Sequence, residues 1–238
     1  MSFYIGLLLK NKVIISADRR VFNPTTNTQE DSFDKIGKIS AFVYFSGAGN
    51  MPFGMKLFKL LKDTPVEFID DIQKISVDDM KRIYGEEMAR ARKEIVGFDS
   101  LKDSEGYLNV SVMLGGFDKE RKPTLCCTSN SENFKYTFTG NYLSVIHPNM
   151  QPAIIQTIGR NVSIMRQQIK DLNEGEQISI IAKHIASLFR EISVQDSSVS
   201  AICDMLILDS SGNSRSVVFN KRESNRNLGW FEYLFRKS

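Results

Sequence analysis

Short apolar runs of strand length and longer amphipathic segments follow one another in blocks along this sequence, and their order strongly constrains the fold. Strand signals come first, followed by helices, more strands, more helices and a closing hairpin. The predicted strands span residues 3–9, 12–18, 35–40, 41–47, 107–118, 123–130, 134–140, 201–209 and 214–220. The predicted helices span residues 50–64, 76–95, 152–170 and 176–192. Helix pairs placed between strand blocks predict an α+β fold with four layers, helix–sheet–sheet–helix.

Two of the predicted helices have clear local signals. Ser76 stands three residues before Asp79, the spacing of a capping box, and an apolar stripe follows it. The members of that stripe are Met80, Ile83, Tyr84, Met88, Ala91 and Ile95. In the helix at 176–192, the side chains that fall on one face are Ile178, Ile181, Ala182, Ile185, Leu188, Phe189 and Ile192. Both stripes predict helices that pack on a sheet.

Composition and charge predict one domain over residues 1–238. The chain has 238 residues, of which 42% are hydrophobic and 25% charged, which suits a single sizeable core. Its 31 Lys and Arg against 28 Asp and Glu give a net charge of +3. The C-terminal segment 221–238 alone holds five basic and two acidic residues, which accounts for this excess. The rest of the chain is balanced, so we expect no nucleic-acid partner.

The start of the chain and the cysteines indicate where the protein acts. Lys10 interrupts the first apolar run, no basic region precedes that run, and no run approaches the roughly 18 residues of a membrane span. We therefore expect neither a signal peptide nor a membrane partner. Three cysteines are an odd number, and the adjacent Cys126 and Cys127 lie in a predicted strand, where their side chains point to opposite faces. We expect a cytoplasmic protein without disulfides. The two histidines, His147 and His184, show no metal-ligand spacing, so we expect no metal and no cofactor.

Three sequence motifs resemble a known family. The stretches VIISADRR, DKIGKIS and FSGAG resemble the opening of a proteasome β-type subunit, an N-terminal nucleophile hydrolase. Further on, VMLGGFDKERKP and SSVSAICDMLIL resemble the bacterial proteasome relatives known as Anbu. The motif resemblance is strongest over residues 2–49, while the order of elements resembles the family along nearly the whole chain. It implies the four-layer fold already expected from the pattern.

The resemblance also implies a set of site residues. Removal of Met1 would make Ser2 the first residue and the nucleophile, with the acidic partner sixteen positions later (18 − 2). The implied catalytic residues are Ser2, Asp18, Arg20, Lys35 and Gly47, the last through its backbone N–H as the oxyanion donor. The implied substrate-binding residues are Phe22, Phe45 and Gly49. The family's D-x-x-S-G-G motif reads here as DSSVSAI, which brings in Asp196 with either Ser198 or Ser200.

The chemistry of these residue types supports the same site. A serine hydroxyl needs a base, and a free α-amine with a pKa of about 7.7 to 8.0 is one, so no histidine is required. A buried Lys35 ammonium would favour loss of the hydroxyl proton, with Asp18 balancing its charge. Each residue also has an ordinary explanation: Asp18 and Arg20 as strand caps, Lys35 as a solvated charge, and SGAGN as a tight turn. These residues occur together in the family's order and with nearly the family's spacings along the sequence, which favours the catalytic interpretation.

The sequence thus predicts a cytoplasmic peptidase that cleaves peptide bonds in peptides or unfolded proteins through an acyl-enzyme on Ser2. An amidase or a peptide ligase on the same fold is the alternative enzyme. The alternative from another class is a non-catalytic assembly subunit like the proteasome α subunits, which carry an extension before their first strand. We expect no such extension here, because the first strand begins at residue 3. We also expect a ring or helical homo-oligomer, with the aromatic cluster around Trp230 docked on its own domain or on a neighbouring subunit.

Overall fold

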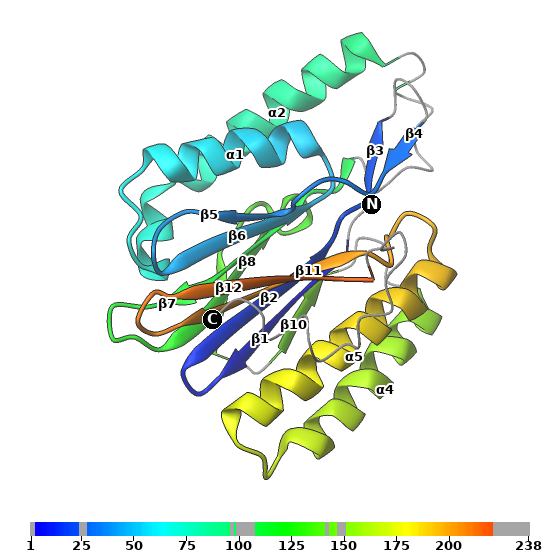
Figure 1. Ribbon diagram of the computed structural model, residues 1–238. Helices are drawn as coiled ribbons and strands as arrows, with labels where there is room; N and C mark the ends of the chain where they lie inside the picture. The colour runs from blue at the N-terminus through cyan, green and yellow to red at the C-terminus, as the bar shows by residue number, and fades with distance from the viewer. Residues whose placement is uncertain are drawn as a thin grey trace.

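The computed structural model describes residues 3–23, 28–95, 98, 108–140, 143–146 and 151–220. Within these residues, two five-stranded antiparallel sheets pack face to face, and helices cover the outer face of each sheet (Figure 1). The first sheet has the order β10 (Leu143–Ile146), β1 (Tyr4–Leu9), β2 (Lys12–Asp18), β11 (Cys203–Asp209) and β12 (Ser214–Phe219). The second has the order β5 (Ile36–Lys38), β6 (Val43–Ala48), β7 (Ser111–Phe117), β8 (Pro123–Ser129) and β9 (Thr137–Thr139). The predicted α+β fold of four layers is confirmed.

The helices form where the sequence supplies apolar stripes and polar caps. Helices α1 (Met51–Asp63) and α2 (Val77–Glu94) cover the second sheet, while α4 (Pro152–Ile169) and α5 (Glu174–Gln195) cover the first. Asn50 caps α1 by accepting from the Phe53 N–H at 2.9 Å. Ser76 caps α2 by accepting from the Asp79 N–H at 3.0 Å, as the spacing of these residues predicted. Asn173 and Glu176 form a reciprocal capping box at the start of α5.

The hydrophobic core has three parts, one between each pair of neighbouring layers. The part between the two sheets includes Tyr4, Leu8, Val13, Ile15, Ala17, Tyr44, Ala48, Met113, Phe117, Leu125, Leu206 and Leu208. The part between the first sheet and α4 and α5 contains the Phe3 ring, whose centroid lies 4.7 Å from that of Phe189. The part under α1 and α2 contains Cys126, while Cys127 packs on the inter-sheet side, so the predicted opposite orientation of these thiols is confirmed. Both faces of each sheet are therefore buried, one against the other sheet and one against helices.

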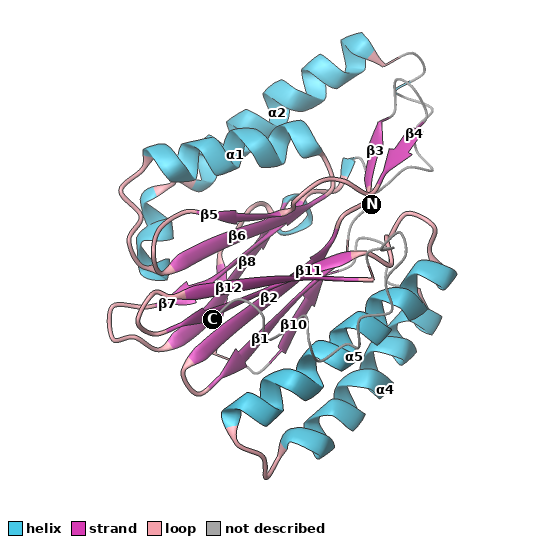
Figure 2. Ribbon diagram, viewed as in Figure 1, coloured by secondary structure: helices cyan, strands magenta, loops and turns pink. Residues whose placement is uncertain are grey.

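Several elements were not predicted from the sequence. Strand β10 pairs with β1, and the short strands β3 (Val21–Asn23) and β4 (Thr28–Glu30) form a hairpin that stands apart from both sheets, near the start of β1 (Figure 2). Two short 3₁₀ helices, η1 (Ile69–Lys74) and η3 (Asn130–Glu132), connect longer elements. No helix in the described part of the chain is long and apolar enough to cross a membrane. The C-terminal segment 221–238 lies outside the described residues.

Candidate active site

A fully buried carboxylate, Asp18, lies at the end of β2 and collects hydrogen-bond donors from four parts of the chain. Its Oδ1 accepts from the Phe3 backbone N–H at 2.8 Å, and its Oδ2 accepts from the backbone N–H groups of Arg20 at 2.9 Å and Ser200 at 3.4 Å. The Lys35 ammonium donates to both oxygens at 3.0 Å. A buried carboxylate is stable only with such compensation, and here a charge and three backbone dipoles supply it.

Phe3 is held on both of its polar backbone atoms by the same residue. The Asp18 side chain binds the Phe3 nitrogen, and the Asp18 N–H donates to the Phe3 carbonyl at 3.0 Å. The Phe3 nitrogen is the atom through which Ser2 is joined to the chain. Ser2 itself, the predicted nucleophile, lies outside the described residues. The structure therefore fixes the point at which the predicted nucleophile is attached, beside the Asp18 carboxylate.

Lys35 joins the two sheets at this point. It stands immediately before β5 in the second sheet, whereas Asp18 ends β2 in the first. Only 6% of its side chain is exposed. Burial lowers the pKa of Lys35, and the neighbouring Asp18 carboxylate acts in the opposite direction. The sequence alternative of a solvated edge lysine therefore does not describe this side chain, which is buried and ion-paired.

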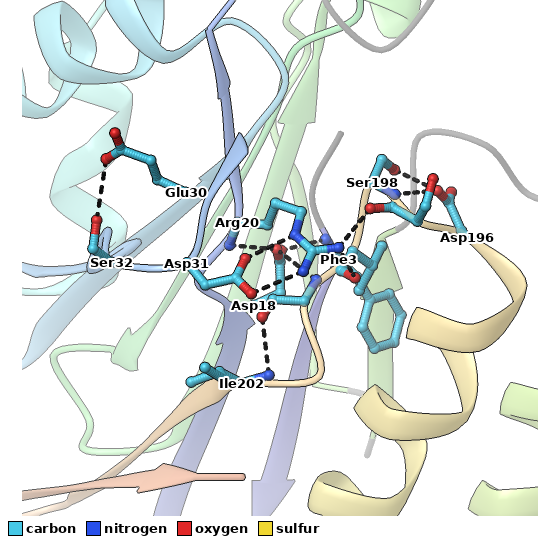
Figure 3. A network of polar contacts seen from close by, with 12 residues as sticks. Phe3, Asp18, Arg20, Glu30, Asp31, Ser32, Asp196, Ser198 and Ile202 are labelled. Atoms are coloured by element: carbon cyan, nitrogen blue, oxygen red, sulfur yellow. Dashed lines mark hydrogen bonds and ion pairs between the residues drawn. The ribbon is translucent and has the colours of Figure 1, made fainter. Parts of the chain in front are cut away.

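Arg20 directs its guanidinium toward Asp31, just after the β3–β4 hairpin (Figure 3). Its Nε and Nη2 donate to the two Asp31 oxygens at 2.7 and 2.8 Å. Its Nη1 donates to the carbonyls of Ser197 at 2.6 Å and Val199 at 3.2 Å. Hydrogen bonding to Arg20 lowers the pKa of Asp31, and the same pair raises the pKa of Arg20. Sequence reasoning missed Asp31, because no motif marks an acid eleven residues beyond Arg20.

The 196–200 segment follows α5 and brings the remaining polar groups to the same place. Asp196, the C-cap of α5, accepts from the Ser198 backbone N–H at 2.8 Å and from the Ser198 hydroxyl at 2.5 Å (Figure 3). Ser200 is fully buried; its N–H binds Asp18, and its hydroxyl accepts from the Ile202 N–H at 3.0 Å. The structure therefore gives the two serines different surroundings: Ser198 is hydrogen-bonded to Asp196, and Ser200 is hydrogen-bonded to Asp18.

The two predicted glycines lie at the end of β6. The pairing of β5 with β6 ends where Ile36 faces Ser46, so Lys35 and Gly47 are the next residues along these two strands. Gly49 has φ +96°, and a Cβ placed on it would lie 1.8 Å from the Asn109 carbonyl oxygen. Glycine is therefore required at this turn by conformation and by space. The oxyanion role of Gly47 and the substrate-binding role of Gly49 stay predictions.

The two predicted aromatic residues of the substrate pocket lie in different elements. Phe45 is buried in the core under α1, and its ring centroid lies 5.6 Å from that of Phe58. Phe22 belongs to β3, and its side chain is outside the described part of the structure. Their substrate-binding role also stays a prediction. Among the described residues, no group of three or more His, Cys, Asp or Glu side chains could hold a metal ion.

A second charged cluster adjoins the first. Arg19 forms an ion pair with Asp34, and its Nε lies 3.4 Å from the Asp204 Oδ2. Burial raises the pKa of Asp204 to about 6, although the Arg19 charge acts to lower it. This end of the molecule thus carries two arginines and at least four carboxylates, each arginine being paired with an acid.

Comparison with known proteins supports the fold. No protein-family model matches the chain, and no curated protein matches its sequence. Among solved structures, the chain is similar to Anbu (ancestral beta-subunit) from Yersinia bercovieri, with a TM-score of 0.60 and 13% identity over 92% of this chain and 87% of that chain. It is also similar to an Anbu (Gly-1) mutant from Hyphomicrobium sp. strain MC1, with a TM-score of 0.58 and 14% identity over 94% and 89% of the respective chains. The chain has the proteasome-like fold of Anbu, as its motifs predicted. At this identity the likeness establishes the fold alone.

Proposed function

We propose that this chain is an N-terminal-nucleophile peptidase in which Ser2, made the first residue by removal of Met1, attacks a peptide carbonyl. One observation carries the proposal: the Asp18 carboxylate binds both the Phe3 nitrogen, where Ser2 is attached, and the Lys35 ammonium at 3.0 Å. A buried charge pair and the start of the chain thus meet on one carboxylate. A cation near the Ser2 hydroxyl would favour loss of its proton, so this shared contact supports the proposal.

The reaction proceeds through an acyl-enzyme. The Ser2 hydroxyl gives its proton to the free α-amine as its oxygen bonds to the carbonyl carbon. The protonated amine then gives that proton to the departing peptide nitrogen, and the carbon–nitrogen bond breaks. Water, deprotonated by the same amine, bonds to the ester carbon; the bond from that carbon to the Ser2 oxygen then breaks, and the oxygen takes the proton from the amine, which restores Ser2. The Lys35 ammonium stabilises the developing alkoxide, and the Gly47 N–H is the proposed donor to the oxyanion.

Asp18 and Lys35 depend on each other in this scheme. An ammonium with 6% of its side chain exposed would be costly to keep charged without a counter-ion. The Asp18 carboxylate supplies that counter-ion, while its backbone bonds keep it from moving toward the substrate. Lys35 thereby remains available as a cation whose pKa is already lowered by burial.

The test uses the full-length chain with the mass of its N-terminus determined. We expect loss of Met1, and covalent labelling of Ser2 by a hydroxyl-reactive peptide electrophile, mapped by peptide mass. Ser2→Ala removes the attacking oxygen, and one residue added ahead of Ser2 removes the base. Both changes should lower the peptidase activity by about 10²-fold or more, the usual size of general-base assistance. Ser2→Thr should keep activity. Ser193→Ala, in α5, serves as the serine-to-alanine control.

The alternatives are separate outcomes of this experiment. A chain that retains Met1 and does not react with the electrophile would be a non-catalytic assembly subunit. Transfer of the acyl group to an added amine in preference to water would indicate a ligase, and release of ammonia would indicate an amidase. Full turnover by Ser2→Ala on a substrate that the wild type cleaves would refute the nucleophile assignment.

We further propose a cytoplasmic homo-oligomer that acts on peptides or unfolded proteins with an uncharged side chain on the acyl side of the cut. Light scattering on the full chain and on a form ending at Asn220 tests the assembly and the role of the C-terminal segment. That end point keeps the Asn220 side chain, which donates to the carbonyls of Ala186 at 3.0 Å and Ala201 at 2.8 Å. A monomeric full-length chain would refute the assembly.

A further inference from the structure

The Arg20 side chain connects three segments that are distant in the sequence. Its guanidinium binds Asp31 beyond the β3–β4 hairpin and the carbonyls of Ser197 and Val199 beyond α5, while its own backbone N–H binds Asp18 (Figure 3). A guanidinium is planar and rigid, so the direction of two of its nitrogens sets the direction of the third. Whatever holds Nε and Nη2 therefore also aims Nη1.

Asp31 holds those two nitrogens. Its carboxylate accepts from Nε at 2.7 Å and from Nη2 at 2.8 Å, a bidentate geometry that fixes the plane of the guanidinium. Nη1 then points at the Ser197 and Val199 carbonyls, at 2.6 and 3.2 Å. The next residue along, Ser200, donates its N–H to Asp18. A chain of direct contacts thus runs from Asp31 to the Asp18–Lys35 pair.

We propose that Asp31 is a positioning residue of the active site, which acts through Arg20 to hold the 196–200 segment against Asp18. The inference rests on the proposed function for its catalytic meaning, but the contacts themselves do not depend on it. Asp31 contacts the site through Arg20 and through the Ser200 side chain, whose hydrogen bond helps to lower the pKa of Asp31. It also reaches the site by charge.

The charge of Asp31 gives the proposal an electrostatic consequence. Asp31 raises the pKa of the buried Lys35, and Arg20 lowers it, so the two charges of the pair partly cancel at that ammonium. Neutralising Asp31 leaves the Arg20 charge uncompensated, and the pKa of Lys35 falls. Loss of a purely local surface contact would not move this pKa.

The global stability of the protein should change little when Asp31 is replaced. The side chains of Arg20 and Asp31 are 23% and 29% exposed, and partly exposed ion pairs generally contribute little to folding. A large effect confined to the site would therefore distinguish positioning from general stabilisation. The neighbouring Glu30 offers a matched control, since it is exposed and its carboxylate contacts the Ser32 hydroxyl at 3.4 Å.

The experiment compares Asp31→Asn with Glu30→Gln in the full-length chain. Each substitution removes one negative charge and keeps the side-chain size. We expect Asp31→Asn to speed amide hydrogen exchange at Arg20 and Ser200 by about tenfold or more and to lower the pKa of Lys35 measured by NMR of labelled lysine. The rate of Ser2 labelling by the electrophile should fall by up to about 10²-fold, as for a misplaced catalytic group. The alkaline limb of the pH profile of this labelling rate should move to lower pH, because Lys35 loses its proton at a lower pH. Glu30→Gln should leave the exchange rates, the Lys35 pKa, the labelling rate and the pH dependence of that rate unchanged.

A second pair of variants keeps the test decisive. Asp31→Glu restores the carboxylate and should recover part of both the exchange protection and the Lys35 pKa. Arg20→Lys keeps the charge but loses the bidentate contact, so it should also speed exchange at Ser200. Unchanged exchange and an unchanged Lys35 pKa in Asp31→Asn would overturn the proposal. If the wild type fails to react with the electrophile, the proposed function fails, while the exchange and pKa measurements still decide the role of Asp31.

Discussion

Replacing Asp18 with Asn would test whether this carboxylate keeps Lys35 charged inside the protein. The Lys35 ammonium lies 3.0 Å from both Asp18 oxygens, with 6% of the lysine side chain exposed. Removing one partner of a buried ion pair typically costs about 3–5 kcal/mol, because the other charge is left buried without compensation. We therefore expect Asp18→Asn to lower the free energy of unfolding by about this amount at pH 7.

The cost should depend on pH in a defined direction. Burial already lowers the pKa of Lys35 in the wild type, and the Asp18 charge opposes that lowering, so the pKa falls further in the variant. Below a lysine's ordinary value of about 10.4, the unfolded chain then binds more protons than the folded one, and stability rises with pH. The difference between wild type and variant should shrink by up to about 1.4 kcal/mol per pH unit between their two folded-state pKa values.

Urea unfolding followed by circular dichroism at pH 7 and at pH 9 would measure both effects. Lys35→Met is the matched control, because it leaves the Asp18 carboxylate with the backbone N–H groups of Phe3, Arg20 and Ser200. It should cost less than Asp18→Asn and show no recovery at alkaline pH. The double variant should be more stable than Asp18→Asn alone. A loss below about 1 kcal/mol in Asp18→Asn, or one independent of pH, would refute the reasoning.

Two further predictions concern stability. Gly49→Ala should lower the free energy of unfolding by about 1–3 kcal/mol or more, because φ is +96° and the added Cβ would overlap the Asn109 carbonyl; Gly54→Ala, in open space on α1, should instead raise it by up to about 1 kcal/mol. Equal effects in urea unfolding would contradict this. The raised pKa of Asp204, about 6, means that the folded state holds this proton more tightly than the unfolded state, so its stabilising effect is present below about pH 4 and lost as pH rises through 6. Asp204→Asn should therefore exceed the wild type in stability at pH 8 by on the order of 1 kcal/mol, after allowance for solvent screening, and match it near pH 4; a less stable variant at pH 8 would show that attraction to Arg19 dominates.

Most of the fold could be predicted because its elements have strong local patterns. The hairpin of β1 and β2, the capped helix α2 and the closing hairpin of β11 and β12 all lie where the apolar periodicity placed them. Strand β10 has only four residues and pairs with β1, so its existence depends on a partner distant in the sequence. One residue on the buried face of α2 also departs from the predicted stripe. Glu87 is 1% exposed, because Lys56 at 2.5 Å and Arg90 at 2.7 Å neutralise it.

The candidate site could be predicted only as far as motifs extend. Asp18 and Lys35 come within 3.0 Å of each other, as the family's order of residues implied. Asp31 was not predicted as a site residue, because its contact with Arg20 requires the chain to turn back through the β3–β4 hairpin, and the sequence did not predict that hairpin. Ser200 likewise reaches Asp18 across 182 residues of sequence, a contact that local patterns do not encode.

The pairing of β2 with β11 determines when this site can exist during synthesis. Lys12 faces Asp209 and Asp18 faces Cys203, so β2 is synthesised well before the strand that pairs with it. Until then Asp18 lacks the Ser200 N–H, and Arg20 lacks the carbonyls of Ser197 and Val199. Contacts of such long range form slowly, after their loop-closure entropy has been overcome. A nascent chain on the ribosome would thus carry Asp18, Arg20 and Lys35 without the geometry of the site, which could form only after residues 196–209 have left the ribosome.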